Sequence, residues 1–257
     1  MFLTKRRKFI FCSILLTGGL TLIQLGVMPS RYLAIFILSF LTIPLTLWSL
    51  KESLHGPIWL TSWILPLLFT TGVCLFYFLL PGSLLSAIPI IIIYFLGMYA
   101  LFLSENIFAV AAIRTIQLFR SASAVSFLLT LVASFFLYDT VFSFRLPFYY
   151  NGLLVFIISF FLFLQGIWSV NLEEKISFSV FLYSFFLSLG MGEIALVYSL
   201  WPTAITLSSL FLTTLIYVSL GIVQAKLNDR LFKKIVLEYL AVGLVVLLVL
   251  FGLTQWG

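Results

Sequence analysis

Charged residues are scarce in this chain of 257 residues. Lys, Arg, Asp and Glu together make up 9% of it, whereas a soluble domain carries about 25%. Apolar residues make up 63%, and the mean hydropathy is +1.24. So few charges cannot cover a water-exposed surface, which excludes a soluble enzyme, a secreted disulfide scaffold and a disordered chain. The composition instead predicts a multi-pass membrane protein.

Histidine and cysteine are equally scarce. The chain has one histidine, His55, and two cysteines, Cys12 and Cys74, with no CxxC or Cys/His spacing. The pattern predicts buried free thiols, and we expect no metal ion and no other cofactor. The GxSxG, P-loop, HExxH and paired-aspartate motifs are also missing, which argues against an enzyme. Acid–base chemistry by a pair of membrane carboxyls is the enzymatic alternative.

Long apolar runs dominate what is present, and nine of them approach the ~20 residues that a membrane-crossing helix needs. The sequence therefore predicts an all-α bundle of nine transmembrane spans. The predicted spans are Phe9–Val27, Tyr32–Leu50, Ile58–Leu80, Leu84–Leu103, Ala122–Phe144, Pro147–Trp168, Ile176–Leu200, Thr203–Val223 and Ile235–Thr254.

The segment 105–120 fits none of these spans. Joined to the following apolar run it would give a helix of about 40 residues, roughly 60 Å long, which exceeds a hydrocarbon core of about 30 Å. Asn106, Arg114 and Gln117 fall near one helical face. This pattern predicts an amphipathic helix at the membrane interface, with Ser104 as its N-cap.

The basic residues predict an orientation. If the N-terminus lies inside, 12 of the 14 basic residues fall on the inner side and only Arg31 and Arg145 on the outer side. The inner set is Lys5, Arg6, Arg7, Lys8, Lys51, Arg114, Arg120, Lys175, Lys226, Arg230, Lys233 and Lys234. The positive-inside rule then predicts nine spans with the N-terminus inside and the C-terminus outside. Because this charge is a topology signal, the net charge of +6 does not indicate nucleic-acid binding.

No predicted loop is long enough to form a soluble domain. We therefore expect residues 1–257 to form a single integral membrane domain in the cell membrane, with the lipid bilayer as its surroundings. Any chemistry or recognition must then take place within or beside the bilayer.

Acids inside the spans are the strongest functional candidates, because each costs about 2.5–3.5 kcal/mol at the centre of a membrane helix. Glu193 and Asp139 both fall in the outer half of their spans, and Arg145 lies near the same surface. We interpret the three as an outward-facing polar pocket. The alternative is that these carboxyls only lock the packing of the helices.

Polar stripes follow two of these spans. Tyr183 shares a helical face with Glu193, and Thr213 and Tyr217 belong to a line of small and hydroxyl residues in the segment 203–223. We add Tyr183, Thr213 and Tyr217 to the candidate binding residues. The alternative for both stripes is helix packing through small polar side chains.

One part of the chain resembles a known family. The stretch Leu103–Phe148, LSENIFAVAAIRTIQLFRSASAVSFLLTLVASFFLYDTVFSFRLPF, is similar to a family of uncharacterised multi-pass membrane proteins from small-genome bacteria. The resemblance continues through Leu164–Ser169 and Ser219–Ala225. It implies no activity, and it suggests that the region of Arg114 and Asp139 is a shared feature.

Three functions remain open at this point. The first is a transporter-like or lipid-handling protein whose outer pocket takes a small molecule or a lipid. The second is a non-catalytic subunit or scaffold that packs against a membrane protein partner in a larger envelope complex. The third is a membrane enzyme acting on lipid-linked substrates. A solvated cavity, a dry core with a bound partner, and a lipid head group beside both acids would distinguish them.

Overall fold

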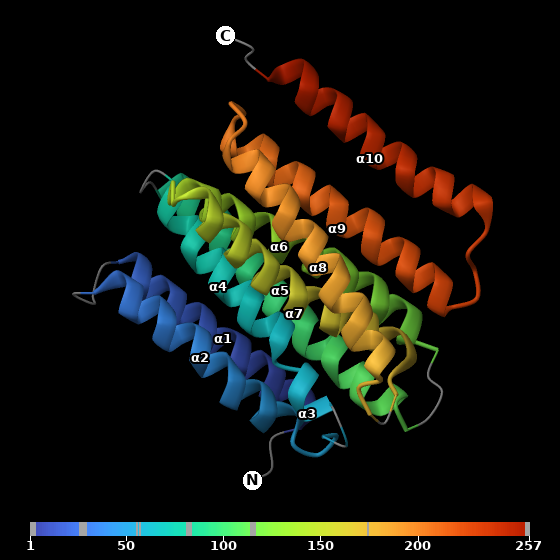
Figure 1. The fold of residues 1–257 in the computed structure, drawn as a ribbon. Helices are drawn as coiled ribbons and strands as arrows, with labels where there is room; N and C mark the ends of the chain where they lie inside the picture. Colours follow the sequence, from blue (N-terminus) through green and yellow to red (C-terminus); the bar gives the residue numbers. More distant parts are fainter. Residues whose placement is uncertain are drawn as a thin grey trace. The chain divides into compact units, whose positions relative to one another are not determined.

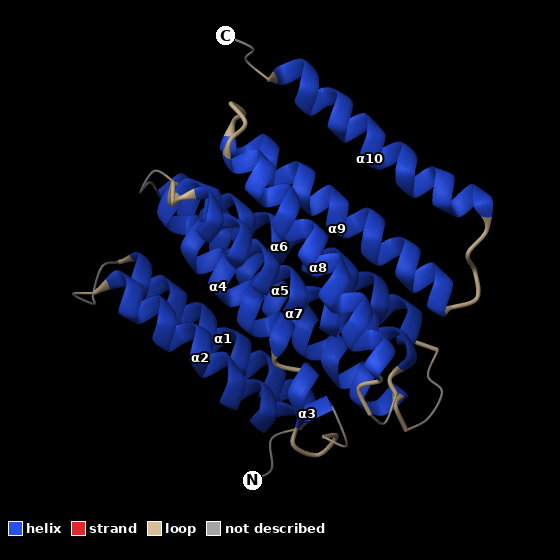
Figure 2. Cartoon of the chain, in the orientation of Figure 1, coloured by secondary structure: helices blue, strands red, loops and turns tan. Residues whose placement is uncertain are grey.

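The structure is a computed structural model that describes residues 4–25, 30–54, 56, 58–80, 84–113, 117–173 and 175–254. Within these residues the chain forms helices joined by loops and no strand (Figure 2). The helices are α1 (Lys5–Gln24), α2 (Arg31–Leu50), α3 (Ile58–Thr61), α4 (Ile64–Leu79), α5 (Leu84–Ala111), α6 (Phe119–Ser143), α7 (Phe148–Asn171), α8 (Phe178–Ser199), α9 (Ile205–Leu227) and α10 (Lys233–Leu253) (Figure 1).

The prediction of nine spans in a helical bundle is confirmed. Among the described residues, nine helical segments are long and apolar enough to cross a membrane, with α3 and α4 together forming one of them, Ile58–Leu79. Helices satisfy every backbone polar group internally, which is why hydrocarbon favours them over open strands. The chain is therefore a multi-pass membrane protein by length and composition.

The prediction of a separate interfacial helix over 105–120 is wrong for the residues that the structure describes. Residues 105–111 are the last two turns of α5, and α6 begins at Phe119. Glu105 is 1% exposed and Phe108 is fully buried, so this segment packs inside the protein rather than lying along its surface. No glycine or proline interrupts the helix after Ser104, and Ser104 is an interior residue of α5 and not a cap. Arg114 and His55 lie outside the described residues.

The chain divides into two compact units, Met1–Ala133 and Ser134–Gly257. In the first unit α1 packs on α2 and α5, and α4 packs on α2 and α5. Buried aromatic side chains fill these contacts, since the Phe9 and Phe102 rings stack 6.3 Å apart and the Thr70 and Tyr94 hydroxyls lie 3.0 Å apart. At one end, Lys8 Nζ donates to Glu52 Oε1 at 2.8 Å, which ties the start of α1 to the end of α2.

In the second unit α7 packs on α8 and α9, and α9 also contacts α8 and α10. Glycines allow α7 and α8 to approach closely. A Cβ on Gly192 would stand 3.0 Å from the carbonyl oxygen of Gly152, so neither position has room for a side chain. This approach fixes the spacing of the α7 and α8 ends that build the site below.

The last helix is mostly exposed. In α10 only Leu250 is buried, and the helix contacts α9 through pairs such as the Tyr217 and Tyr239 rings, 5.0 Å apart. Figure 1 shows α10 running alongside α9. After Glu238 its exposed surface is apolar, as lipid contact requires.

Candidate functional site

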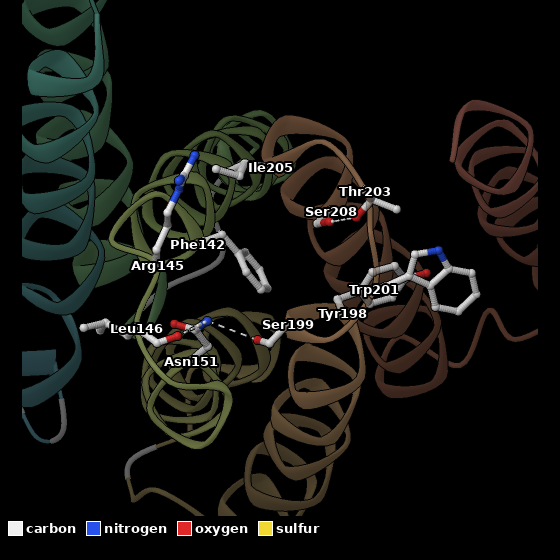
Figure 3. Close-up of a pocket in the computed structure, with 10 residues that line it drawn as sticks. All are labelled: Phe142, Arg145, Leu146, Asn151, Tyr198, Ser199, Trp201, Thr203, Ile205 and Ser208. Carbon is white, nitrogen blue, oxygen red and sulfur yellow. Dashed lines mark hydrogen bonds between the residues drawn. The ribbon is translucent and has the colours of Figure 1, made fainter. Parts of the chain in front are cut away.

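A pocket of about 360 Å³ opens where four helix ends of the second unit meet (Figure 3). The ends are the C-termini of α6 and α8 and the N-termini of α7 and α9, together with the two loops that join them. The lining residues are Phe142, Arg145, Leu146, Asn151, Tyr198, Ser199, Trp201, Thr203, Ile205 and Ser208. Because the ends of apolar helices lie at the level of lipid head groups, the pocket belongs to the interface and not to the hydrocarbon centre.

Arg145 provides the positive charge of the pocket. Its backbone ends α6 in the left-handed region, with φ 49°, and its N–H donates to the Phe142 carbonyl oxygen at 3.1 Å. Pro147 then starts α7, as its fixed φ and missing N–H favour. The Arg145 side chain is exposed and extends toward Ile205, away from Asn151 (Figure 3). No ion pair is found for it among the described residues.

Asn151 provides a buried amide in the first turn of α7. Asn151 is 3% exposed, and its Nδ2 donates to Ser199 Oγ at 3.1 Å and to the Leu146 carbonyl oxygen at 3.4 Å. Ser199 Oγ gives its own proton to the Ala195 carbonyl, so it accepts from Asn151. The amide group of Asn151 therefore has its nitrogen, and not its oxygen, facing these two acceptors. The amide oxygen Oδ1 is buried and has no hydrogen-bond partner within the described part of the chain.

Hydroxyl and aromatic groups complete the wall. The hydroxyls of Thr203 and Ser208 lie 2.6 Å apart, and the rings of Tyr198 and Trp201 stack at 5.7 Å. Figure 3 shows Tyr198 and Trp201 across the pocket from Arg145. A cation, a buried acceptor, hydroxyls and an aromatic wall together suit a ligand that carries a negative charge and hydrogen-bond donors.

Asp139 lies close to this pocket along the chain but does not line it. It lies in the last turns of α6 and is 6% exposed, and its Oδ1 accepts a hydrogen bond from Ser209 Oγ at 3.0 Å. Ser209 follows Ser208, so the buried carboxyl and the pocket share the first turns of α9. This contact joins α6 to α9.

Glu193 lies on the exposed face of α8, between the exposed residues Leu189 and Val197. No hydrogen bond or ion pair joins it to Asp139 or Arg145 in the part of the chain that the structure describes. The structure thus places the three residues separately: Arg145 in the pocket, Asp139 buried between helices, and Glu193 on the outer face of α8.

The other three candidate residues lie elsewhere in the second unit. Tyr183, near the start of α8, accepts a hydrogen bond from Lys226 Nζ at 2.9 Å, at the opposite end of α8 from Ser199. Thr213 accepts one from Ser134 Oγ at 3.4 Å, in the middle of α9. Tyr217 packs its ring on Tyr239 of α10. The structure does not bring these three to the pocket.

Sequence reasoning did not select Asn151, Ser199 or Ser208 as binding residues. Each is a single polar residue in the first or last turn of a span, so no helical periodicity marks it. The sequence offered one indirect signal, because successive spans cross the membrane in opposite directions. The ends of α6 and α8 and the starts of α7 and α9 therefore lie on the same side, at the breaks Arg145–Pro147 and Trp201–Pro202.

Among the described residues no group of three or more histidine, cysteine, aspartate or glutamate side chains could hold a metal ion. The model of a family described as protein of unknown function (DUF5656) matches residues 13–253, which confirms the resemblance to an uncharacterised family. The chain matches no curated protein and no solved structure.

Proposed function

Because the chain belongs to the DUF5656 family of proteins of unknown function, its role must be inferred from its own geometry, and we propose that it is a transporter-like or lipid-handling protein of the cell membrane. It would bind the anionic head group of an amphiphile in the pocket between the ends of α6, α7, α8 and α9. The observation that carries this proposal is the exposed Arg145 guanidinium beside a pocket at head-group depth.

Two properties of the pocket support an amphiphile over a fully soluble ligand. The helices around it expose apolar side chains, including Phe148 and Leu200, so an acyl chain would find a hydrocarbon surface beside the pocket. Arginine also recognises phosphate and carboxylate through paired N–H donors. The distribution of basic residues supports an orientation with this pocket on the outer side of the membrane.

The test is retention of lipid by the purified protein. The chain is reconstituted into nanodiscs of phosphatidylcholine with a minority of phosphatidylglycerol, and the lipids that stay bound are measured by native mass spectrometry. We expect wild type to retain the anionic lipid and Arg145→Gln to lose most of it. Arg31→Gln is the matched control, because it removes one positive charge from the start of α2, in the other unit. Equal retention by wild type and Arg145→Gln would contradict the proposal.

A second candidate function, that of a non-catalytic subunit of a larger complex, is favoured by Glu193. An acid on the exposed face of a membrane helix carries an energetic penalty unless a partner supplies a counter-charge or a hydrogen-bond donor. No described residue of this chain bonds to it, so a partner helix with a lysine, arginine or hydroxyl at that depth would lower the penalty.

This candidate is tested by isolating the chain from its native membrane in lipid nanodiscs. A subunit would carry a stoichiometric protein partner that is lost in Glu193→Gln. Glu238→Gln is the control, since Glu238 is also an exposed acid within a span, in α10. An unchanged partner in Glu193→Gln, or no partner in wild type, would remove this candidate.

A further inference from the structure

The buried amide of Asn151 constrains the ligand further than Arg145 does. Asn151 lines the pocket. Its amide nitrogen donates to Ser199 and Leu146, and its amide oxygen is buried and has no hydrogen-bond partner among the described residues. A buried acceptor without a donor is destabilising, because the atom has lost its hydration and no hydrogen bond replaces it. We infer that the ligand's head group donates a hydroxyl hydrogen to Asn151 Oδ1 while its phosphate binds Arg145. The inference rests on the proposed function and names its ligand class.

The polarity of the site favours a hydroxyl as the donor. Asn151 Oδ1 can only accept, so the ligand must supply an O–H or N–H group. A ligand ammonium would share the pocket with the Arg145 cation and be repelled by it, whereas a hydroxyl carries no charge. The neighbouring Thr203 and Ser208 hydroxyls can both donate and accept, and they would accommodate a second ligand hydroxyl.

The arrangement of the two recognition groups favours an extended head group. Arg145 extends toward Ile205 and away from Asn151, so the two groups point to different parts of the pocket (Figure 3). A polyol joined to phosphate through an ester carries its negative charge and its hydroxyls on separate atoms, several bonds apart. A phosphodiester of glycerol or of a similar polyol therefore fits the pocket. Such a group occurs on membrane lipids and on the soluble glycerophosphodiesters that remain when their acyl chains are removed.

The experiment compares two lipids of equal charge. Phosphatidylglycerol and phosphatidylethanol are both phosphodiesters with one negative charge, and only the first has free hydroxyls. Wild-type protein in phosphatidylcholine nanodiscs with equal amounts of both is analysed for bound lipid. We expect a preference for phosphatidylglycerol of roughly three- to tenfold, the equivalent of one net hydrogen bond. Because this comparison uses the wild type, it does not depend on the folding of a variant.

A variant then tests whether Asn151 causes the preference for phosphatidylglycerol. Asn151→Leu should bind both lipids equally through Arg145, whereas Tyr150→Leu, an exposed neighbour in the same turn of α7, should keep the wild-type preference. Equal retention of both lipids by wild type overturns the hydroxyl inference and leaves the proposed function standing. Retention of neither lipid overturns both.

A further arm separates the two sources of the ligand. Glycerophosphoglycerol, the deacylated phosphodiester head group of phosphatidylglycerol, is added to the loaded nanodiscs as a soluble competitor. We expect it to leave phosphatidylglycerol bound, because the acyl chains add apolar contact that the soluble compound lacks. Displacement at comparable concentration would keep the polyol phosphate as the ligand class and overturn the lipid as its source.

Discussion

Asp139 and Ser209 form a buried contact between α6 and α9. Ser209 Oγ lies 3.0 Å from Asp139 Oδ1, and Asp139 is 6% exposed. Asp139→Leu removes the acceptor, and we expect it to lower stability by about 0.6 kcal/mol and at most about 1.7 kcal/mol, the range of side-chain hydrogen bonds in membrane proteins. Asp139→Asn keeps an acceptor oxygen and should stay near wild type. Thermal unfolding in nanodiscs measures both, and an equal loss in the two variants would show that the hydrogen bond contributes nothing.

Glu52 lies outside the membrane-spanning helices, and its ionisation makes the stability of the fold depend on pH. The hydrogen bond from Lys8, together with its positive charge, holds the pKa of Glu52 below its ordinary value of 4.5. A carboxyl whose pKa is lower in the folded state than in the unfolded state stabilises the fold at pH values above its unfolded-state pKa. This contribution disappears as the pH falls through the pKa of the folded state.

The prediction is therefore a pH-dependent difference between wild type and Glu52→Gln. The Tm difference should be constant from neutral pH down to about 4.5 and shrink below it. Glu173→Gln, in the loop between α7 and α8, is the control and should show no such decline. Because Glu52 is exposed, added salt should reduce the difference. A difference that grows on acidification would contradict the assignment.

Residue spacing alone could identify polar groups but not their partners. The acids and the stripe of the segment 203–223 were visible in the sequence, and Ser209 of that stripe does bond to Asp139. Spacing could not show that Asn151 reaches Ser199, which is 48 residues away, because the close approach of α7 to α8 creates that contact. Whether a face points to lipid or to protein depends on the neighbouring helices, as the exposed Glu193 illustrates.

Among the elements, the α7–α8 pair gives the clearest test. A side chain on Gly192 would meet the Gly152 carbonyl oxygen at 3.0 Å and Phe156 Cβ at 3.1 Å. We expect Gly192→Val to lower stability by roughly 1–3 kcal/mol, as overpacking does, and to weaken lipid retention by separating Asn151 from Ser199. Gly190→Ala is the control, because a Cβ there meets nothing within 4 Å. Equal stability of the two variants would contradict close packing at this point.

The helices themselves were largely predictable because hydropathy over ~20 residues decides membrane insertion. The extension of α5 to Ala111 was not predictable in this way. Its last turns carry Glu105 and Asn106, whose polarity resembles that of a surface helix, and packing within the first unit buries Glu105. Tertiary contacts therefore overrode the local pattern.

For the whole molecule, the orientation of the nine spans is a prediction that labelling can check. Ala204→Cys, in the loop between α8 and α9, and Leu231→Cys, in the loop between α9 and α10, are exposed positions at opposite ends of α9. The native Cys12 and Cys74 are buried and should contribute little background. We expect a membrane-impermeant maleimide to label Ala204→Cys in intact cells and Leu231→Cys only after permeabilisation.

Two other labelling patterns would be informative. The reverse pattern would invert the orientation and place the pocket on the inner side. Labelling of both positions from one side would show that α9 does not cross the membrane.

The single buried residue of α10 has a practical consequence for purification. Leu250 is the only buried residue of this helix, and most of its other residues are exposed to the surroundings of the protein. A detergent that replaces lipid poorly should therefore release α10 before any other helix of the second unit and expose Tyr217 and Gly221 of α9. Amide hydrogen exchange would then be fastest at the C-terminal end of the chain, and a reporter fused there would respond to the loss of lipid before global unfolding occurred.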